Sequence, residues 1–172
     1  NGFDTKKMYE EYYCDLPEIV VIPNAVEKRL LHKNINPLEN EVLKIAFIGR
    51  LEKIKGFDSF CCSIEMFNKI SICNLIEFYI IGYGSLEKDA ISLQNKYENV
   101  HYLGKMNNKD IYTFISAIDC SVNLTICTET MGGAGLSNSL LESIFSNNLI
   151  IAWNTVNFNQ ILKKNRNSGL FF

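Results

Sequence analysis

Residues 42–57 read VLKIAFIGRLEKIKGF. The stretch opens on an apolar run, Val42–Ile48, with the length and composition of a buried strand, and Gly49 closes it. From Lys55 to Cys73, apolar residues then recur at helical spacing. These positions are Phe57, Phe60, Ile64, Phe67 and Ile70. A buried strand followed at once by an amphipathic helix predicts the first unit of a βα repeat.

The same alternation continues along the chain. Further strands are predicted over Ile76–Ile81, Val100–Leu103, Cys120–Leu124 and Leu149–Trp153, with a short earlier one over Ile19–Ile22. Further helices are predicted over Leu86–Tyr97, Asp110–Ala117, Asn138–Phe145 and Phe158–Leu162. Short connections between alternating strands and helices predict an α/β fold, a Rossmann-like parallel sheet with helices on both faces. In such sheets, ligands bind beyond the carboxyl ends of the strands.

Composition excludes several classes of protein. The chain has 172 residues, of which 47% are hydrophobic and 21% charged, enough to bury the core of one domain. A formal net charge of −2 leaves no basic face, so nucleic acid is not an expected partner. No apolar run approaches the roughly 20 residues of a membrane span. Six Cys without a C-x-x-C pair, and only two His, argue against a zinc site and a disulfide framework and favour a cytoplasmic protein.

Two cations follow the first strand. Gly49 and Arg50 come directly after it, and Lys55 stands at the start of the next helix. A guanidinium, an ammonium and the free N–H groups of a helix N-terminus together suit a diphosphate. The alternative is a pair of solvated surface cations.

A glycine-rich segment, Gly132–Gly135, leads into the helix that begins near Asn138. Ser137 and Asn138 are good N-cap residues, so this helix start also favours an anion. Glu142, one turn later, borders an apolar face, where a carboxylate can accept two ribose hydroxyls; the alternative is a solvated helix residue. His101 lies within a strand and His32 in a polar loop, and both are interpreted as structural or solvated.

Six motifs, in a fixed order, make the chain resemble the C-terminal half of a GT-B glycosyltransferase of the retaining family 4 (glycosyltransferase group 1). They are Val21–Val26, Ile48–Leu51, Lys55–Phe57, Ile80–Gly84, Asn99–Gly104 and Gly135–Glu142. The resemblance implies that this half binds a nucleotide diphosphate sugar donor and that an N-terminal half, absent here, holds the acceptor. Residues 1–26 would then be a linker or hinge. Residues 27–172 would be the nucleotide-sugar-binding domain, truncated at its C-terminal end.

The resemblance also assigns roles by position. To the donor diphosphate it assigns Arg50, Lys55, Gly49, Gly84, Gly135, Leu136 and Ser137. To the nucleobase and ribose it assigns Gly104, Lys105, Met106 and Glu142. The donor is a substrate, and no cofactor is expected.

One departure from the family pattern concerns catalysis. The family usually carries an earlier Glu, associated with the donor sugar, and Ala134 stands eight positions before Glu142. The loop Thr125–Gly133 is longer than usual, and Glu129 within it is an alternative acidic residue. No catalytic residue is therefore assigned. No Asp-x-Asp pair that would hold a divalent cation occurs, so a metal-independent reaction is expected, with Arg50 and Lys55 neutralising the leaving diphosphate.

Three functions remain open at this point. The first is the donor-binding domain of a retaining hexosyl or related glycosyltransferase. It would act on a glycan or lipid-linked acceptor in bacterial surface polysaccharide synthesis, in the cytoplasm or at the inner face of the membrane, with peripheral membrane association of the full-length protein. The second is a non-catalytic, glycosyltransferase-like binding subunit. The third is a GT-B-fold nucleotide-sugar epimerase. This segment alone is expected to transfer no sugar.

Overall fold

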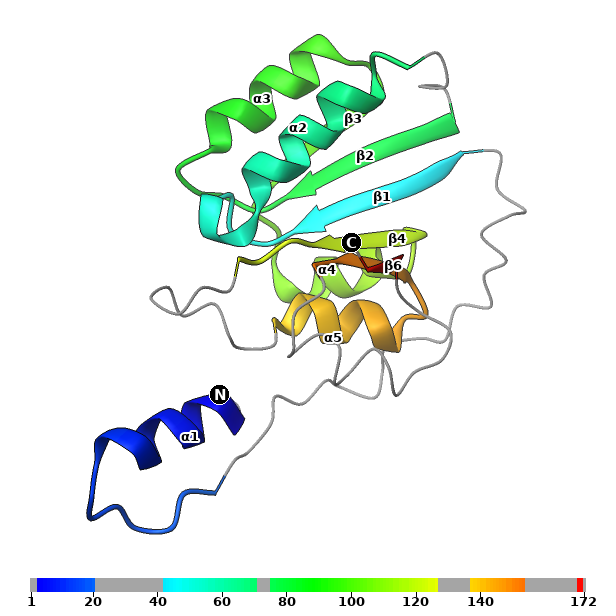
Figure 1. The fold of residues 1–172 in the computed structure, drawn as a ribbon. Coiled ribbons are helices and arrows are strands. Elements are labelled where there is room, and N and C mark those ends of the chain that lie inside the picture. The colour runs from blue at the N-terminus through cyan, green and yellow to red at the C-terminus, as the bar shows by residue number, and fades with distance from the viewer. Residues whose placement is uncertain (1–2, 21–41, 71–74, 127–136, 154–169, 172) are drawn as a thin grey trace.

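The computed structural model describes residues 3–20, 42–70, 75–126, 137–153 and 170–171 (Figure 1). The helices are α1 (Phe3–Tyr12), α2 (Phe57–Phe67), α3 (Glu87–Lys96), α4 (Asn108–Ile115) and α5 (Asn138–Phe145), with a 3-10 turn, η2, at Lys53–Lys55. The strands are β1 (Leu43–Ile48), β2 (Ile76–Ile81), β3 (Val100–Gly104), β4 (Cys120–Asn123), β5 (Leu149–Ala152) and β6 (Leu170–Phe171).

Within these residues the strands form one sheet in the order β3-β2-β1-β4-β5-β6, and every adjacent pair is parallel. The predicted Rossmann-like α/β fold is confirmed. The chain builds outward from β1 to β3 and then returns to the other side of β1 at β4. The strand order therefore reverses between β1 and β4, and the crevice beyond their carboxyl ends is where such sheets bind ligands.

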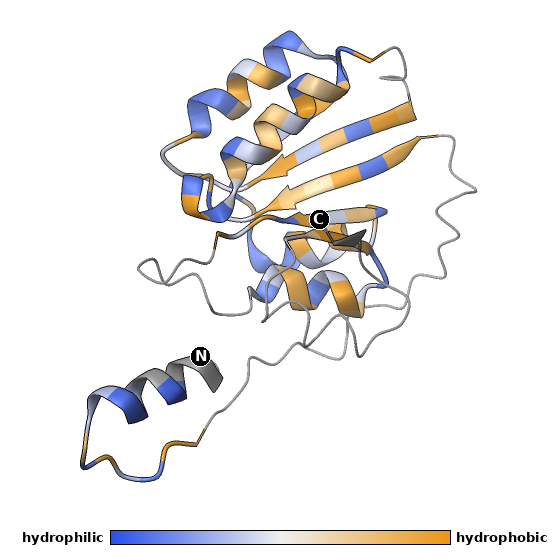
Figure 2. Cartoon of the chain, viewed as in Figure 1, coloured by the Kyte–Doolittle hydropathy of each residue, from blue (hydrophilic) through white to orange (hydrophobic). Residues whose placement is uncertain are grey.

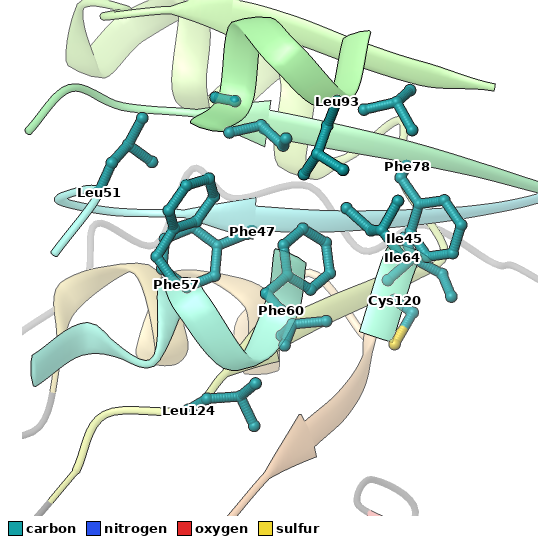
Figure 3. Packing of buried hydrophobic residues seen from close by; sticks show 14 residues of the cluster. Ile45, Phe47, Leu51, Phe57, Phe60, Ile64, Phe78, Leu93, Cys120 and Leu124 are labelled. Carbon is teal, nitrogen blue, oxygen red and sulfur yellow. The ribbon is translucent and has the colours of Figure 1, made fainter. Parts of the chain in front are cut away.

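One face of the sheet is covered by α2 and α3 (Figure 1). Phe57 and Phe60 of α2 pack on Phe47 of β1, with ring centroids 5.1 and 5.6 Å apart. Phe60 also meets Phe78 of β2 edge-on at 6.1 Å. Figure 3 shows these rings gathered between α2 and the sheet, with Ile64 one turn further along the helix. The helical spacing of the apolar residues explains why α2 presents one continuous apolar face.

The opposite face carries α4 and α5. Ala46 and Ile48 point to this side because successive strand residues alternate between the faces, and Ile115 of α4 packs against them. Leu140 of α5 covers Ile150 of β5. Figure 2 shows the resulting pattern: β1 and β2 are mostly hydrophobic, and hydrophilic residues lie along α3. No helix in the described part of the chain is long and apolar enough to cross a membrane.

The helix predicted over Lys55–Cys73 is shorter than expected. Gly56 has a left-handed φ of 71°, which separates η2 from α2, and a Cβ there would collide with the backbone of Leu124. At the other end, the Nδ2 amide of Asn68 donates to the carbonyl of Ile64 at 3.0 Å, and α2 ends at Phe67. Residues 71–74 lie outside the described residues.

The N-terminal segment also differs from expectation. Residues 3–12 form α1, which the periodicity did not predict, with the ion pairs Lys6–Glu10 and Lys7–Glu11 at 3.6 and 3.8 Å along its surface. Ile19 and Val20 do not lie in a strand, so the strand predicted over Ile19–Ile22 is wrong for this half. The remainder of that strand, the boundary proposed at residues 26 and 27, and the helix predicted over Phe158–Leu162 fall outside the described residues.

Candidate functional site

A cavity of about 320 Å³ lies beyond the carboxyl ends of β1 and β2, at the edge of the sheet where the sequence predicts ligand binding. Five of the residues that the sequence assigns to donor binding line it: Gly49, Arg50, Lys105, Met106 and Glu142. They come from the loops after β1 and β3 and from α5. The fold thus brings together residues that lie far apart in the chain.

A smaller cavity of about 40 Å³ adjoins the first, because Gly49 and Ser139 line both. It contains two more of the predicted residues, Lys55 and Ser137. The side chains of Asn123 and Thr125 add further polar groups to its lining. A charged group of a ligand would therefore meet several hydrogen-bonding partners here.

The positive charges of Arg50 and Lys55 have no carboxylate partner among the described residues. Burial lowers the pKa of the Lys55 ammonium, and the neighbouring positive charge of Arg50 lowers it further. Arg50 itself is exposed, so water solvates its guanidinium. Among the described residues, no carboxylate lies within ion-pair distance of either side chain. Two neighbouring positive charges that have no counter-charge among the described residues favour the binding of an anion.

The N-terminus of α5 points to the same place. Ser137 is its N-cap, and its Oγ accepts a hydrogen bond from the backbone N–H of Leu140 at 3.1 Å, as the sequence predicts. The Nδ2 amide of Asn123, at the end of β4, donates to the same Oγ at 2.8 Å. Sequence reasoning missed Asn123, although a polar residue ending an apolar strand was a usable signal. This contact fixes the start of α5 beside the smaller cavity.

Glu142 is half-buried on α5. Burial raises the pKa of its carboxyl group, and a hydrogen bond from the Tyr112 side chain opposes that rise. Tyr112 lies on α4 and lines the same cavity. Sequence reasoning missed it because the contact joins two helices that are separated in the chain by β4.

The larger cavity is also lined by aromatic and apolar side chains. Tyr83 is 52% exposed, and the ammonium of Lys105 lies over its ring, 5.0 Å from the ring centroid. Met106 and Ile111 line this cavity too. A flat aromatic surface beside apolar side chains can stack on a planar ring. Tyr83 lies between Gly82 and Gly84, and the sequence analysis treated that segment only as a glycine turn.

Two of the predicted glycines do not line either cavity. A Cβ on Gly84 would meet the carbonyl oxygen of Leu51 at 2.5 Å, so a glycine here lets the loops after β1 and β2 pack together. The backbone N–H of Leu51 donates to the carbonyl of Tyr83 at 3.0 Å, and Ser85 Oγ donates to the Glu52 carboxylate at 2.8 Å. Gly104 has a left-handed φ of 67°, and a Cβ there would have no neighbour within 4 Å. Contact of these two glycines with a donor stays a prediction.

Several other predicted residues lie elsewhere or outside the described residues. His101 packs against Tyr79, with ring centroids 4.8 Å apart, and lines neither of these cavities. Outside the described residues fall Gly135, Leu136, Ala134, Glu129 and His32. No group of three or more potential metal ligands occurs in the described part of the chain.

A third cavity, of about 390 Å³, is a different kind of site. It lies between α2 and the sheet, among residues such as Phe60, Leu124 and Trp153, and Ser59 and Ser63 supply the hydroxyl groups of its described lining. None of its described lining residues is charged, and we therefore assign the candidate site to the two cavities at the strand ends.

The chain is similar in sequence to known proteins. The family described as Glycosyl transferases group 1 matches residues 43–172. The chain is 27% identical over 124 residues to an uncharacterized 41.2 kDa protein in the cps region of Klebsiella pneumoniae, covering 64% of this chain and 33% of that protein. The chain thus spans about a third of the length of this curated relative.

Two solved structures share the fold. The pneumococcal O-GlcNAc transferase GtfA, in complex with UDP and GlcNAc, superposes with a TM-score of 0.64 at 20% identity, over 91% of this chain and 29% of that one. The C-terminal domain of a glycosyl transferase group 1 family protein, LpcC, from Francisella tularensis gives a TM-score of 0.56 at 18% identity, over 86% and 80%.

Proposed function

This chain belongs to the glycosyl transferases group 1, and on that premise we propose that it is the donor-binding domain of a retaining enzyme that transfers a hexosyl or related sugar from a nucleotide diphosphate sugar. The observation that carries the proposal is the uncompensated pair of cations, Arg50 and Lys55, beside the N-terminus of α5. A diphosphate supplies the negative charge that this arrangement lacks.

The two cavities match the parts of such a donor. In the larger one, Tyr83 and Met106 offer a surface for the base, and Glu142 offers acceptors for the ribose hydroxyls. The smaller one, with Lys55 and Ser137, adjoins it where the diphosphate would lie. The base, the ribose and the diphosphate would thus each meet side chains of suitable chemistry in two adjoining cavities.

The same residues have a role in the reaction. When the bond between the sugar and the diphosphate breaks, negative charge grows on the leaving diphosphate. The Arg50 guanidinium, the Lys55 ammonium and the N–H groups of the α5 N-terminus stabilise that charge, and we propose that they do so without a metal ion. No residue of the described part is assigned to attack or proton transfer.

We also propose where the acceptor binds and where in the cell the reaction takes place. We place a glycan or lipid-linked acceptor on an N-terminal half, with closure of the two halves bringing its hydroxyl to the donor. The relative from a cps region supports a role in bacterial surface polysaccharide synthesis, carried out in the cytoplasm or at the inner face of the membrane.

A second candidate function rests on Ala134. The family's usual acidic residue is replaced there, which favours a binding subunit that holds a nucleotide sugar without transferring the sugar. Release of nucleoside diphosphate from a panel of nucleotide sugars, in the presence of acceptors, separates the two. An enzyme releases it, whereas a binding subunit only retains the donor.

Calorimetric titration with UDP and with GDP tests the donor site. Arg50→Ala and Lys55→Ala should each weaken binding about ten- to a hundredfold, the effect of removing a charged hydrogen-bonding partner. Lys53→Ala is the matched control, because Lys53 is an exposed cation of the same loop and lines neither cavity. If both cavity variants bind like the parent, the diphosphate site lies elsewhere.

A further inference from the structure

One acid stands between the two cations of the candidate site in the chain. Glu52 follows Arg50 by two residues and precedes Lys55 by three. Among the described residues its carboxylate forms no ion pair with either cation. Its Oε2 instead accepts a hydrogen bond from Ser85 Oγ at 2.8 Å, and its Oε1 accepts one from the backbone N–H of Ser85 at 3.3 Å. A residue of the loop after β2 therefore holds this carboxylate.

The local alternative to the bond with Ser85 is an ion pair with Lys55. Glu52 is the N-cap of the 3-10 turn η2, and Lys55 is the last residue of that turn. The backbone N–H of Lys55 donates to the carbonyl of Glu52 at 3.0 Å, so the turn closes between these two residues. In 3-10 geometry, side chains three residues apart lie on the same side. A carboxylate released by Ser85 would thus have the Lys55 ammonium as its nearest counter-charge along the chain.

We propose that Ser85 positions the Glu52 carboxylate away from Lys55 and Arg50, and so keeps both cations available to the diphosphate of a donor. Ser85 lines neither cavity of the candidate site and acts through Glu52, which makes it a positioning residue. This inference rests on the proposed donor-binding function. It adds a contact that controls how strongly the site attracts an anion.

The main chain places Ser85 opposite Glu52. The backbone N–H of Leu51 donates to the carbonyl of Tyr83, and the backbone N–H of Leu86 donates to the carbonyl of Leu51, both at 3.0 Å. Leu51 directly precedes Glu52, and Leu86 directly follows Ser85, so these bonds bring the two residues side by side. Neither bond uses a side chain. Ser85→Ala should therefore remove the hydroxyl without separating the loops.

The N-terminus of α3 also favours the observed position of the carboxylate. The N-cap of α3 is Leu86, which makes no side-chain capping bond. Glu52 reaches the N–H of Ser85, one residue before this N-cap, and brings a negative charge to the end of the helix where the helix dipole favours an anion. Beside Lys55, the same charge would compete with a diphosphate, because the ligand would have to displace it before binding.

The experiment is calorimetric titration of the parent, Ser85→Ala, Glu52→Gln and the double variant with UDP, GDP and inorganic pyrophosphate. Ser85→Ala should weaken binding about two- to fivefold, the range that a competing exposed ion pair between Glu52 and Lys55 gives. Glu52→Gln removes the competing charge and should bind at least as tightly as the parent. The double variant should bind as tightly as Glu52→Gln, because no carboxylate remains for Ser85 to hold.

A matched control exists near the other end of β2. The Tyr79 hydroxyl donates to the Glu77 carboxylate at 2.6 Å, and neither residue lines a cavity of the candidate site. Tyr79→Phe also releases a carboxylate, but Glu77 lies near the start of β2, whereas Arg50 and Lys55 follow the end of β1. Affinity for all three ligands should be unchanged in this variant.

Salt gives a second measurement. Added sodium chloride screens an exposed ion pair between Glu52 and Lys55. The ratio of the parent's affinity to that of Ser85→Ala should therefore fall toward one as the salt concentration rises. A ratio that stays constant would mean that Ser85→Ala acts through the shape of the loop, and it would overturn the inference.

Recovery in the double variant separates this inference from a structural role. If the bond between Glu52 and Ser85 only spaces the loops, the double variant binds no better than Ser85→Ala. That result overturns the inference, as does a Ser85→Ala variant that binds like the parent.

Pyrophosphate separates the inference from the proposed function. A parent that binds pyrophosphate, with the expected order among the variants, but neither UDP nor GDP supports the role of Ser85 and overturns donor binding. A parent that binds a nucleotide without that order retains the proposed function and overturns the inference. A parent that binds none of the three ligands overturns both.

Discussion

The aromatic core beneath α2 and the cavities at the strand ends are built from opposite kinds of side chain. In the core, Phe57 and Ile64 are fully buried, and the rings of Phe47, Phe57 and Phe60 pack against one another. Around the cavities, burial disfavours the charged forms of the residues present. It lowers the pKa of the Lys55 ammonium and raises the pKa of the Glu142 carboxyl, because both groups lose water.

The difference indicates that one region stabilises the fold and the other binds a ligand. Burial of apolar rings stabilises the fold, whereas half-burial of charged groups lowers stability. The charged groups instead provide a binding site. Substitutions in the two regions should therefore change different quantities. Core substitutions reduce the free energy of unfolding, and cavity substitutions reduce affinity at little cost in stability. Three variants test this contrast, in addition to those of the donor site.

The largest effect is expected in the core. Phe57→Ala removes a fully buried ring that contacts two others and should lower the free energy of unfolding by about 3–5 kcal/mol. Urea denaturation measures the change. Met66→Ala is the control on the same helix, because Met66 is 67% exposed, and it should shift stability by no more than about 0.5 kcal/mol. Similar values for the two variants would contradict the assignment of the core.

An intermediate effect is expected at the border between the two regions. Gly84→Ala forces a Cβ against the carbonyl of Leu51 and should cost roughly 1–3 kcal/mol of stability, since the two loops must move apart. The same movement displaces Tyr83 and Arg50 and should weaken UDP or GDP binding. Ser85→Ala, in the same loop, removes only an exposed hydrogen bond to Glu52 and should cost no more than about 1 kcal/mol. A stable Gly84→Ala protein with full affinity would show that the loops are not coupled.

The smallest effect on stability is expected at Glu142. A substitution there should raise stability slightly, whereas the two preceding substitutions should lower it. The folded-state pKa of this carboxyl lies above its unfolded value, so the folded state binds more protons between the two values. Its contribution to stability is present at low pH and is lost as the pH rises through the raised pKa. Glu142→Gln should therefore equal or slightly exceed the parent in stability at pH 7, by less than about 1 kcal/mol after solvent screening, while binding nucleotide more weakly.

Melting temperatures at pH 4 and pH 7 test this sign. The gain of Glu142→Gln over the parent should be larger at pH 7 than at pH 4. Glu65 gives the contrasting control, because a hydrogen bond from Lys96 at 2.8 Å lowers the pKa of its carboxyl. Glu65→Gln should show no such gain at pH 7. A large loss of stability in Glu142→Gln, with unchanged affinity, would make Glu142 a structural residue.

Much of the fold could be predicted because its signals are local. The strand Ile76–Ile81 and the helix Asn138–Phe145 have the predicted bounds, and the strands β1, β3, β4 and β5 differ from prediction by a residue at one end. Each is a run of apolar residues with a simple period, ended by a glycine or a polar residue. Where a long-range contact intervened, prediction failed. Gly56 packs against Leu124, far along the chain, and this contact separates η2 from α2.

The candidate site divides in the same way. Arg50, Lys55 and Ser137 could be selected from the sequence because each stands next to a strand end or a helix start, and such positions determine where a side chain lies in a parallel sheet. Residue types alone could not show that Arg50 and Lys55 line separate, adjoining cavities, or that Gly84 serves loop packing. These facts depend on distances between loops.

By itself, then, the sequence determined the succession of strands and helices from β1 to β5, the parallel sheet, and the edge of the sheet where charged residues gather. These features follow from periodicity and from the neighbours of each residue in the chain. Only the tertiary structure decided which residues meet across that edge. Tyr112 and Glu142 line one cavity, and Asn123 reaches Ser137, because β4 and α5 return the chain to the centre of the sheet beside α4. Contacts of that kind join residues far apart in sequence, and no local pattern encodes them.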